Sequence, residues 1–391
     1  MKRLKIGIFM DSYYPAIDGV VIVIDNLAKS LSKYNDVTVV VPYTKTIDDD
    51  INKPYKVTRI KSIPIPLTEY RVGKISNKLS KEYKELLKEN FDIIHIHSPF
   101  TIGSLGLKLA KELNIPCIAT MHTRFDFEIR KIIDSDLIVK EVIKQLIKVY
   151  NKCDCCIAIN HAMIKVFKDY GYKYNPIIIY NGTDLKPLKD VDKNISIVNN
   201  KFNLTNELNV LLFVGRITSI KNIFFILDSL KLLKEDNYPF KMIYVGTGPD
   251  EHKLKSKIKE YHLEKNIIVT GKITNRILLS SIYKRADLFL FPSLFDASSL
   301  VQIEAAVNET PGLFIENSVT ADTITNNVNG YTCELDIIKY KDKIKEILSN
   351  KKELQKVGIK ARKMLGKNWD DISKETYKLY LKQIEKKQVN K

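Results

Sequence analysis

The sequence predicts an α/β protein built from two parallel-sheet domains, and three observations support this fold class. The chain has 391 residues, more than a single hydrophobic core usually supports. Short apolar stretches alternate with amphipathic stretches of helical length, the pattern of parallel sheets covered by helices. The alternation stops between Lys186 and Asn209, where Asn, Asp and Lys accumulate, and then starts again, so we expect a linker there.

The first half contains one clear helix and six stretches of strand length. Helical periodicity runs over Gly19–Lys33, where Val20, Ile24, Leu27 and Leu31 share one face. The expected strands are Leu4–Met10, Val37–Val41, Ile93–Ile96, Cys117–Met121, Cys155–Ile159 and Ile177–Tyr180.

The second half repeats the alternation and ends in a helix. The expected strands are Val210–Val214, Lys241–Val245, Ile267–Val269 and Leu288–Phe291. The expected helices are Phe224–Lys234, Glu251–Tyr261 and the amphipathic tail Trp369–Lys387. Two such domains imply a cleft between them. Ligands of open α/β sheets bind beyond the carboxyl ends of the strands, so functional residues are expected at these ends.

Composition and charge exclude several classes of protein. With 45% apolar and 28% charged residues the chain is neither disordered nor collagen-like. The formal charge of +17 indicates an acidic partner. Only nine of the 63 basic residues are Arg, and no recognition motif is present, so we expect no nucleic-acid partner. No apolar stretch approaches the roughly 20 residues that span a bilayer.

The five cysteines do not form a disulfide framework, which fits a reducing cytoplasm. Cys153, Cys155 and Cys156 contain one Cys-x-x-Cys and no second pair, so free thiols are expected rather than a zinc site. The apolar run Ile6–Met10 is too short for the core of a signal peptide and is interpreted as a strand.

Two basic residues and a glycine-rich turn follow the first two strands of the second half. Arg216 ends a strand and Lys221 begins a helix, a pairing that suits a pyrophosphate at a helix N-terminus. A solvated surface is the alternative for these two residues. The turn from Gly246 to Pro249 lacks the third glycine of a dinucleotide fingerprint, because position 251 is Glu, so a nicotinamide dehydrogenase is disfavoured.

Two acids bracket the next junction between strand and helix. Asp296 precedes the expected helix, and Glu304 lies about two turns into it. Carboxylates of this kind accept hydrogen bonds from sugar hydroxyls. The alternatives are that Asp296 merely caps the helix and that Glu304 is an ordinary surface acid.

Histidines mark two strand ends in the first half. His95 and His97 alternate on one strand and point to the same side. No third metal ligand is evident, so they are interpreted as histidines of the core or of a cleft lining. His122 lies after a strand and before a loop, where structural and functional roles are equally open.

These motifs, taken in order, resemble those of the retaining glycosyltransferase family four. Val-Gly-Arg-x4-Lys, Gly-x-Gly-Pro and Pro-Ser followed by an acid-x7-Glu-Ala match the C-terminal domain of that family, and Met121-His122-Thr123 matches a motif of its N-terminal domain. The resemblance implies the GT-B fold, two Rossmann-like domains facing across a cleft, with a C-terminal helix that crosses back. It assigns 1–187 to an acceptor-binding domain, 188–206 to a linker, 207–367 to a nucleotide-sugar-binding domain and 368–391 to the returning helix.

The resemblance also implies roles for individual residues. Arg216 and Lys221 would hold the donor pyrophosphate, Glu304 would bind the ribose, and Asp296 and His122 would contact the transferred hexose. Further donor-binding residues are expected at Gly19, Gly246, Ser299, Leu300 and Val301. Two positions depart from the family pattern: Asp296 replaces the usual Glu, and Val20 replaces a second glycine.

The segment from His122 to Glu128 is similar to bacterial diacylglycerol glucosyltransferases, which implies a lipid acceptor. In the helical stretch that follows, Ile138, Val142, Leu146 and Val149 alternate with Lys140, Lys144 and Lys148. A basic amphipathic helix of this kind can lie on an anionic membrane, although an ordinary solvated helix face is the alternative. We expect these lysines and Arg124 to contact the acceptor or the membrane, with help from a second basic stretch, Lys74–Lys88.

The expected function is the retaining transfer of a hexose from a nucleotide diphosphate sugar, taken as UDP-glucose, to a membrane lipid such as diacylglycerol or a glycolipid. No metal and no cofactor are expected, because Arg216 and Lys221 supply the positive charge. The expected location is cytoplasmic, with peripheral contact at the inner face of the cell membrane as a hypothesis. Three alternatives stay open: a transferase for a cell-wall or polysaccharide acceptor, a nucleotide-sugar epimerase, and a non-catalytic binding module.

Overall fold

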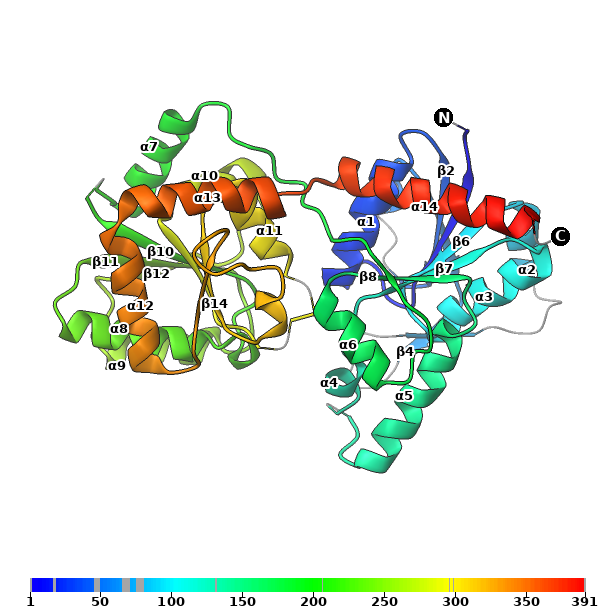
Figure 1. The fold of residues 1–391 in the computed structure, drawn as a ribbon, viewed down its shortest axis with the longest axis horizontal. Helices are drawn as coiled ribbons and strands as arrows, with labels where there is room; N and C mark the ends of the chain where they lie inside the picture. Colours follow the sequence, from blue (N-terminus) through cyan, green and yellow to red (C-terminus); the bar gives the residue numbers. More distant parts are fainter. Residues whose placement is uncertain are drawn as a thin grey trace. The chain divides into compact units, whose positions relative to one another are not determined.

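The computed structural model describes residues 2–16, 19–45, 50–64, 71–74, 81–130, 132–205, 207–294, 296–297 and 299–389. The chain divides into two compact units. Unit 1 joins Met1–Asn181 to Trp369–Lys391, and unit 2 is Gly182–Asn368. Each unit is built on a parallel sheet with helices packed around it (Figure 1), as the alternation of apolar and amphipathic stretches predicts.

The sheet of unit 1 has the strand order β3-β2-β1-β6-β7-β8-β9. Its strands are almost fully buried, because helices cover a parallel sheet on both faces. The order reverses between β1 and β6, which makes this point the switch point of the sheet. The strands are β1 (Lys5–Phe9), β2 (Asp36–Pro42), β3 (Lys56–Ile60), β6 (Ile93–Ile96), β7 (Cys117–Met121), β8 (Cys155–Ala158) and β9 (Ile177–Ile178), with a separate antiparallel pair of β4 (Ser62–Pro64) and β5 (Arg71–Gly73).

The last helix of the chain belongs to unit 1. It packs along α1, where Ser30 donates a hydrogen bond to Asp370, and the Tyr377 hydroxyl donates to the backbone oxygen of Lys2 at 2.5 Å. The helices of unit 1 are α1 (Gly19–Leu31), α2 (Lys81–Lys88), α3 (Thr101–Leu113), α4 (Phe125–Arg130), α5 (Asp136–Tyr150), α6 (His161–Asp169) and α14 (Trp369–Val389).

The sheet of unit 2 has the order β12-β11-β10-β13-β14-β15, and its switch point lies between β10 and β13. Its strands are β10 (Asn209–Val214), β11 (Phe240–Val245), β12 (Ile267–Val269), β13 (Leu288–Phe291), β14 (Gly312–Ile315) and β15 (Tyr331–Cys333). Its helices are α7 (Val191–Phe202), α8 (Ile223–Glu235), α9 (Glu251–Glu260), α10 (Arg276–Arg285), α11 (Leu300–Val307), α12 (Ile337–Ser349) and α13 (Lys351–Leu365), with short 3-10 helices η2 (Ser219–Lys221) and η3 (Val319–Ala321).

The segment 188–206, expected to be a linker, contains helix α7 and belongs to unit 2. Val198 is fully buried, and the Arg285 side chain of α10 donates a hydrogen bond to the Asn199 side chain at 2.6 Å. Val198 is the one residue of α7 that is buried, so the helix lacks the apolar periodicity by which a sequence reveals a helix.

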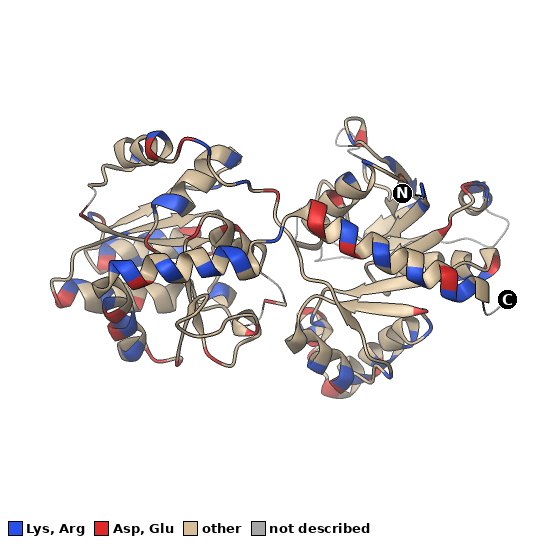
Figure 2. Ribbon diagram, turned by 45° about the horizontal axis from the view of Figure 1, so that its top comes forward, with Lys and Arg blue, Asp and Glu red and all other residues tan. Residues whose placement is uncertain are grey.

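The positive charge of the chain is spread over both units (Figure 2), with Lys and Arg on many helices. Within the described residues, no helix combines the length and the apolar character that crossing a bilayer requires.

Candidate active site

The switch point of unit 2 collects three loops at one edge of the sheet. Strands β11, β10 and β13 are parallel neighbours, so the loops that follow them leave the sheet at the same edge. The loop after β10 carries Arg216 and Lys221, and the loop after β11 carries Gly246. The loop after β13 carries Asp296 and leads into α11, which carries Glu304. The predicted donor residues of unit 2 therefore lie on elements that begin at one edge.

Glycines allow the first two of these loops to pack backbone against backbone. A Cβ atom on Gly246 would lie 1.9 Å from the backbone oxygen of Gly215, and one on Gly248 would lie 2.2 Å from that of Ile217. Gly246 also has a φ of +138°, which disfavours any residue with a side chain. The backbone N–H of Ile217 donates to the oxygen of Thr247 at 3.0 Å. Gly246 and Gly248 thus allow the β10 and β11 loops to pack closely together.

An ion pair joins the β10 loop to the β13 loop. The ammonium group of Lys221 contacts Oδ1 of Asp296, and the Asn222 amide donates to the backbone oxygen of Pro292 at 2.8 Å. Oδ2 of Asp296 is buried and has no hydrogen-bond partner within the described residues. Ser299, not Asp296, occupies the N-cap of α11, and no side chain caps that end. The alternative role of Asp296 as a mere helix cap is therefore wrong.

Glu304 is buried rather than exposed, so its interpretation as a surface acid is also wrong. Its Oε1 atom lies 2.9 Å from the Arg276 guanidinium, and its Oε2 atom accepts a hydrogen bond from the Tyr283 hydroxyl at 3.0 Å. Burial raises the pKa of Glu304, and the charge of Arg276 and the two hydrogen bonds oppose that rise. Arg276 also pairs with Asp184. Glu304 is thus a buried carboxylate held by two partners on α10.

Sequence reasoning missed Arg276 and Tyr283. A detectable signal exists for Arg276, which is the first residue of α10, after the N-cap Asn275. A cation in the first turn opposes the helix dipole, so its presence there indicates an acidic partner elsewhere in the fold.

Other predicted donor residues lie near the same edge. Arg216 is exposed, and its side chain forms no hydrogen bond or ion pair with the other described residues. Ser299, Leu300 and Val301 form the N-terminal end of α11, where the first backbone N–H groups of a helix have no partner inside the helix. These groups can bind the oxygens of an anionic ligand.

The switch point of unit 1 is organised by a buried acid, Asp11, which sequence reasoning did not single out. Its carboxylate accepts hydrogen bonds from the Ser98 and Thr101 hydroxyls at 2.6 and 2.8 Å, and from the backbone N–H groups of Ile102 and Gly103 at 2.7 and 3.2 Å. Burial raises the pKa of Asp11, and these four donors oppose the rise. Asp11 therefore ties the loop after β1 to the start of α3.

Gly19 is exposed at the first position of α1, and a Cβ atom there would have no neighbour within 4 Å. The preceding residues 17 and 18 of the expected glycine-containing loop lie outside the described residues, as do 75–80 of the second basic stretch.

Three buried histidines lie in contact at the carboxyl ends of β6 and β7. The ring centroids of His95 and His97 are 4.1 Å apart, and those of His97 and His122 are 5.1 Å apart. Nδ1 of His97 lies 2.8 Å from Nε2 of His122. His95 bonds to the Thr120 and Tyr380 hydroxyls at 2.6 and 2.7 Å. Burial lowers the pKa of His95 and of His122 to about 3 and that of His97 well below its ordinary value, so all three rings are neutral at physiological pH.

The basic helix α5 is amphipathic, and its buried face is adjacent to the apolar stripe that alternates with the lysines in the sequence. The structure buries Val139, Ile143, Ile147 and Tyr150, each one residue after a member of the expected set. Ile138 is 52% exposed, whereas Val142, Leu146 and Val149 are half-buried. Lys140, Lys144 and Lys148 are exposed as expected. Arg124 binds Asp126 at 2.8 Å and lies over the ring of Phe127.

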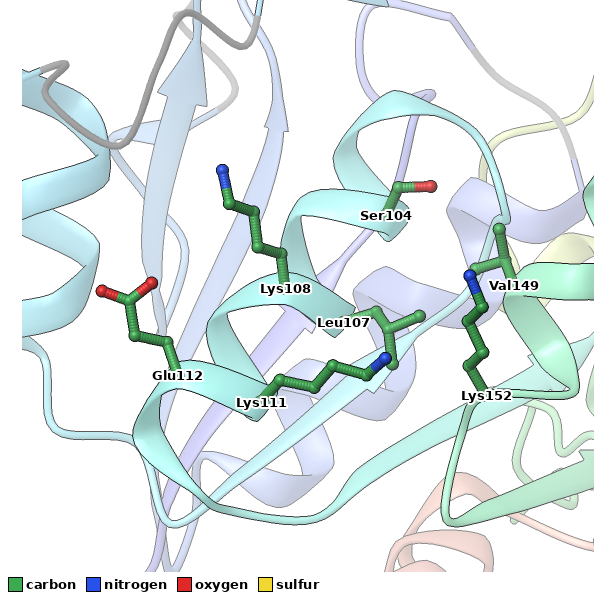
Figure 3. Close-up of a pocket in the computed structure, with 7 residues that line it drawn as sticks. All are labelled: Ser104, Leu107, Lys108, Lys111, Glu112, Val149 and Lys152. Carbon is green, nitrogen blue, oxygen red and sulfur yellow. The ribbon is translucent and has the colours of Figure 1, made fainter.

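A surface pocket of about 530 Å³ lies where the C-terminal end of α5 meets α3. Figure 3 shows its lining, with the amines of Lys111 and Lys152 directed over Leu107 and Val149. The acid of this pocket, Glu112, accepts a hydrogen bond from the Tyr83 hydroxyl at 2.7 Å. The remaining lining residues are Ser104 and Lys108, so the pocket carries more positive than negative charge.

Among the described residues, no three His, Cys, Asp or Glu side chains are grouped so that they could hold a metal ion. The five cysteines are free thiols.

Each half of the chain matches a family model. Residues 17–187 match the model described as Glycosyltransferase Family 4, and residues 195–364 match the model described as Glycosyl transferases group 1.

Relatives and solved structures match over most of the chain. The alpha-monoglucosyldiacylglycerol synthase of Streptococcus pneumoniae is 26% identical over 338 residues, which are 84% of this chain and 74% of the relative. The protein of the same name from Acholeplasma laidlawii is 26% identical over 340 residues, 84% of each chain. The crystal structure of Anabaena Alr3699/HepE in complex with UDP and glucose has a TM-score of 0.75 at 16% identity and covers 96% of this chain and 99% of its own. This likeness confirms the expected fold class, an α/β protein with two Rossmann-like sheets.

Proposed function

Since the chain belongs to the glycosyltransferases of family 4, we propose that it transfers a glucosyl group from UDP-glucose to a membrane lipid, either diacylglycerol or a glycolipid, and retains the anomeric configuration. Two relatives are alpha-monoglucosyldiacylglycerol synthases, and a structural neighbour is described in complex with UDP and glucose. These names motivate the choice of donor and acceptor.

One observation carries the proposal: the Lys221–Asp296 ion pair ties together two loops at the edge of the sheet where α11 presents Glu304. In the proposed reaction Glu304 accepts hydrogen bonds from the ribose hydroxyls. Its carboxylate has about four lone-pair sites, and Arg276 and Tyr283 occupy two of them. Glu304 therefore keeps acceptor capacity for a diol.

The catalytic contribution that we assign to unit 2 is electrostatic. Breaking the bond between sugar and diphosphate places negative charge on the leaving phosphate. Lys221 and Arg216 stabilise that charge together with the N–H groups at the start of α11, and Asp296 contacts the hexose. For His122 of unit 1, a contact with the hexose is proposed from the family resemblance alone. Such a site requires neither a metal ion nor a cofactor.

The lipid acceptor is supported by the surface of α5. Lys140, Lys144 and Lys148 are exposed along this helix, and two of the apolar residues at its N-terminal end, Leu137 and Ile138, are 80% and 52% exposed. Each cation near anionic headgroups contributes about 1 kcal/mol, and exposed apolar side chains add burial in the interface. The lysine-lined pocket at the other end of α5 extends the positive surface (Figure 3). We therefore propose peripheral attachment to a membrane through unit 1.

The reaction is tested by incubating the protein with radiolabelled UDP-glucose and vesicles that contain diacylglycerol. We expect a labelled glycolipid whose glucosyl linkage is α by NMR. A β linkage would overturn the retaining mechanism, and release of an isomerised donor without acceptor would identify an epimerase. Transfer to polysaccharide but not to lipid would show that the acceptor is a polysaccharide rather than a lipid.

Membrane attachment is tested separately by flotation with vesicles of phosphatidylglycerol and phosphatidylcholine. The triple variant Lys140→Glu, Lys144→Glu, Lys148→Glu should lose flotation, whereas a matched triple variant at Lys253, Lys255 and Lys259, exposed lysines of α9, should not. Equal flotation of both variants would exclude α5 as the attachment surface.

A further inference from the structure

The hydrogen bond between the buried rings of His97 and His122 indicates which of their ring nitrogens carry protons. Nδ1 of His97 and Nε2 of His122 are 2.8 Å apart, a hydrogen-bond distance, and the two rings are nearly parallel with an angle of 16°. Their exposed fractions are 4% and 7%. Because both rings are neutral, each carries one proton, and one of these protons lies in the bond between them.

The second nitrogen of His97 decides between the two possible arrangements. Nε2 of His97 is buried and has no hydrogen-bond partner within the described residues. If His122 were the donor, Nδ1 of His97 would be bare and its Nε2 would carry a buried N–H without an acceptor. If His97 is the donor, its Nε2 atom carries no proton, and only a lone pair is left without a partner. Buried N–H groups without a partner are rare in folded proteins, and such a donor costs its full desolvation penalty.

We propose that His97 is a positioning residue that donates its Nδ1–H to Nε2 of His122 and so fixes the tautomer in which His122 carries its proton on Nδ1. Nδ1 of His122 makes no hydrogen bond within the described residues, but unlike Nε2 of His97 it is not among their fully buried atoms without a partner, so solvent can reach it. His122 directly follows β7 at the carboxyl edge of the sheet. The histidine therefore presents an N–H donor, which suits a hydroxyl oxygen of a sugar. The use of this donor on the hexose rests on the proposed function, whereas the tautomer does not.

Neighbouring contacts keep the pair in place. The ring of His95 packs against that of His97, with centroids 4.1 Å apart and an angle of 37° between the planes, and is itself fixed by Thr120 and by Tyr380 of α14. His95 uses both ring nitrogens in these bonds, so it offers no acceptor to Nε2 of His97. Nε2 of His97 therefore stays without a hydrogen-bond partner among the described residues.

The tautomer is tested on the unmodified full chain by NMR. Long-range ¹H–¹⁵N correlation spectra of protein labelled with ¹⁵N-histidine distinguish a protonated ring nitrogen from a bare one. We expect protonated Nδ1 and bare Nε2 on both His97 and His122. A protonated Nε2 on His122 would overturn the proposal, and this measurement requires neither a variant nor enzymatic activity.

The positioning role is tested with two nearly isosteric variants. In His97→Asn the side-chain amide can still donate to His122. In His97→Asp an ionised carboxylate can only accept, so it requires the proton of His122 on Nε2. We expect kcat/KM of the Asp variant to be about 30-fold below that of the Asn variant, the effect of one lost hydrogen bond. UDP affinity should be equal in the two variants. The exposed His161→Asn at the start of α6 serves as the control that leaves activity unchanged.

The two experiments separate the possible failures. The expected NMR spectrum with equal kcat/KM in the Asn and Asp variants would overturn the positioning role alone. The absence of transfer by the unmodified protein would overturn the proposed function but leave the tautomer to be decided by NMR. If the Asp variant does not fold, the His97→Asn spectrum decides, because a bare Nδ1 on His122 in that variant contradicts donation from position 97.

Discussion

Replacing Arg276 with Met should destabilise unit 2, because the buried carboxylate of Glu304 loses its cationic partner. Methionine keeps an apolar stem of similar length but carries neither charge nor hydrogen-bond donors. Tyr283 would remain as a donor to Oε2 of Glu304, so one carboxylate oxygen is affected most.

The expected size of the effect follows from how deeply the ion pair of Arg276 and Glu304 is buried. Removing one partner of a buried ion pair costs about 3–5 kcal/mol, whereas an exposed pair is worth less than about 1 kcal/mol. The side chain of Glu304 is 11% exposed and that of Arg276 is 42% exposed, so this pair is intermediate. We expect a loss of about 2 kcal/mol, which lowers Tm by about 4–8 °C for a unit of this size.

The loss should depend on pH in a defined direction. The pKa of Glu304 is raised above its ordinary value of 4.5 by burial, so the folded unit binds this proton more tightly than the unfolded chain. The stability contributed by the group is full below pH 4.5 and declines as pH rises through the folded pKa. Removing Arg276 raises the folded pKa further and deepens the decline. The difference between R276M and the parent protein should therefore be largest near neutral pH and shrink toward pH 4.5.

Thermal unfolding followed by circular dichroism at several pH values measures this difference. The same substitution in a Glu304→Gln background should cost much less, since no buried charge remains. Arg362→Met removes a more exposed pair with Glu309 in the same unit and should cost less than about 1 kcal/mol. An equal loss in the parent and Glu304→Gln backgrounds, or a loss that does not change with pH, would refute the reasoning.

Three further predictions concern the switch points. Gly246→Ala should destabilise unit 2 by about 2 kcal/mol or more in urea unfolding, because its Cβ would lie 1.9 Å from a backbone oxygen. Gly19→Ala is the control, since a Cβ there meets open space and should not destabilise the protein. Equal losses of stability in the two variants would contradict the packing argument. Asp11→Asn should cost about 2–3 kcal/mol, since an amide nitrogen would face donors, and unchanged stability would show that the carboxylate is not needed. Lys221→Met should lower kcat/KM by about 100- to 1,000-fold, whereas Lys259→Met on α9 should not; similar kinetics would remove Lys221 from the site.

Much of the fold is predictable because its strands are continuous apolar runs. Strands β6, β7, β12 and β13 begin and end where the sequence predicts, since helices on both faces require apolar residues throughout the strand. Strands β3, β14 and β15 were not predicted. β3 and β15 are partly exposed, so their apolar signal is weak, whereas β14 is fully buried but only four residues long.

Periodicity alone could not choose the buried face of α5. Ile138 and Val139 each begin a stripe of apolar residues with helical spacing, and the two stripes are adjacent on the helix. The packing of α5 in unit 1 selects the stripe that begins at Val139. Only tertiary structure contains this information.

The candidate site was predictable in part. The motif spacing marked Lys221, Asp296 and Glu304, and the structure joins the first two in an ion pair. It did not mark Arg276 or Asp11, because their partners lie 28 and 87 or more positions away in the chain. Long-range polar contacts of this kind leave no periodic trace in a sequence.

The return of α14 to unit 1 has a consequence during protein synthesis. Tyr380, which fixes His95, leaves the ribosome after the whole of unit 2, which is one continuous segment. A chain truncated before α14 would contain all of unit 2 but would lack the residue that closes the histidine cluster. Such a chain would test whether unit 2 binds the proposed nucleotide when unit 1 is incomplete.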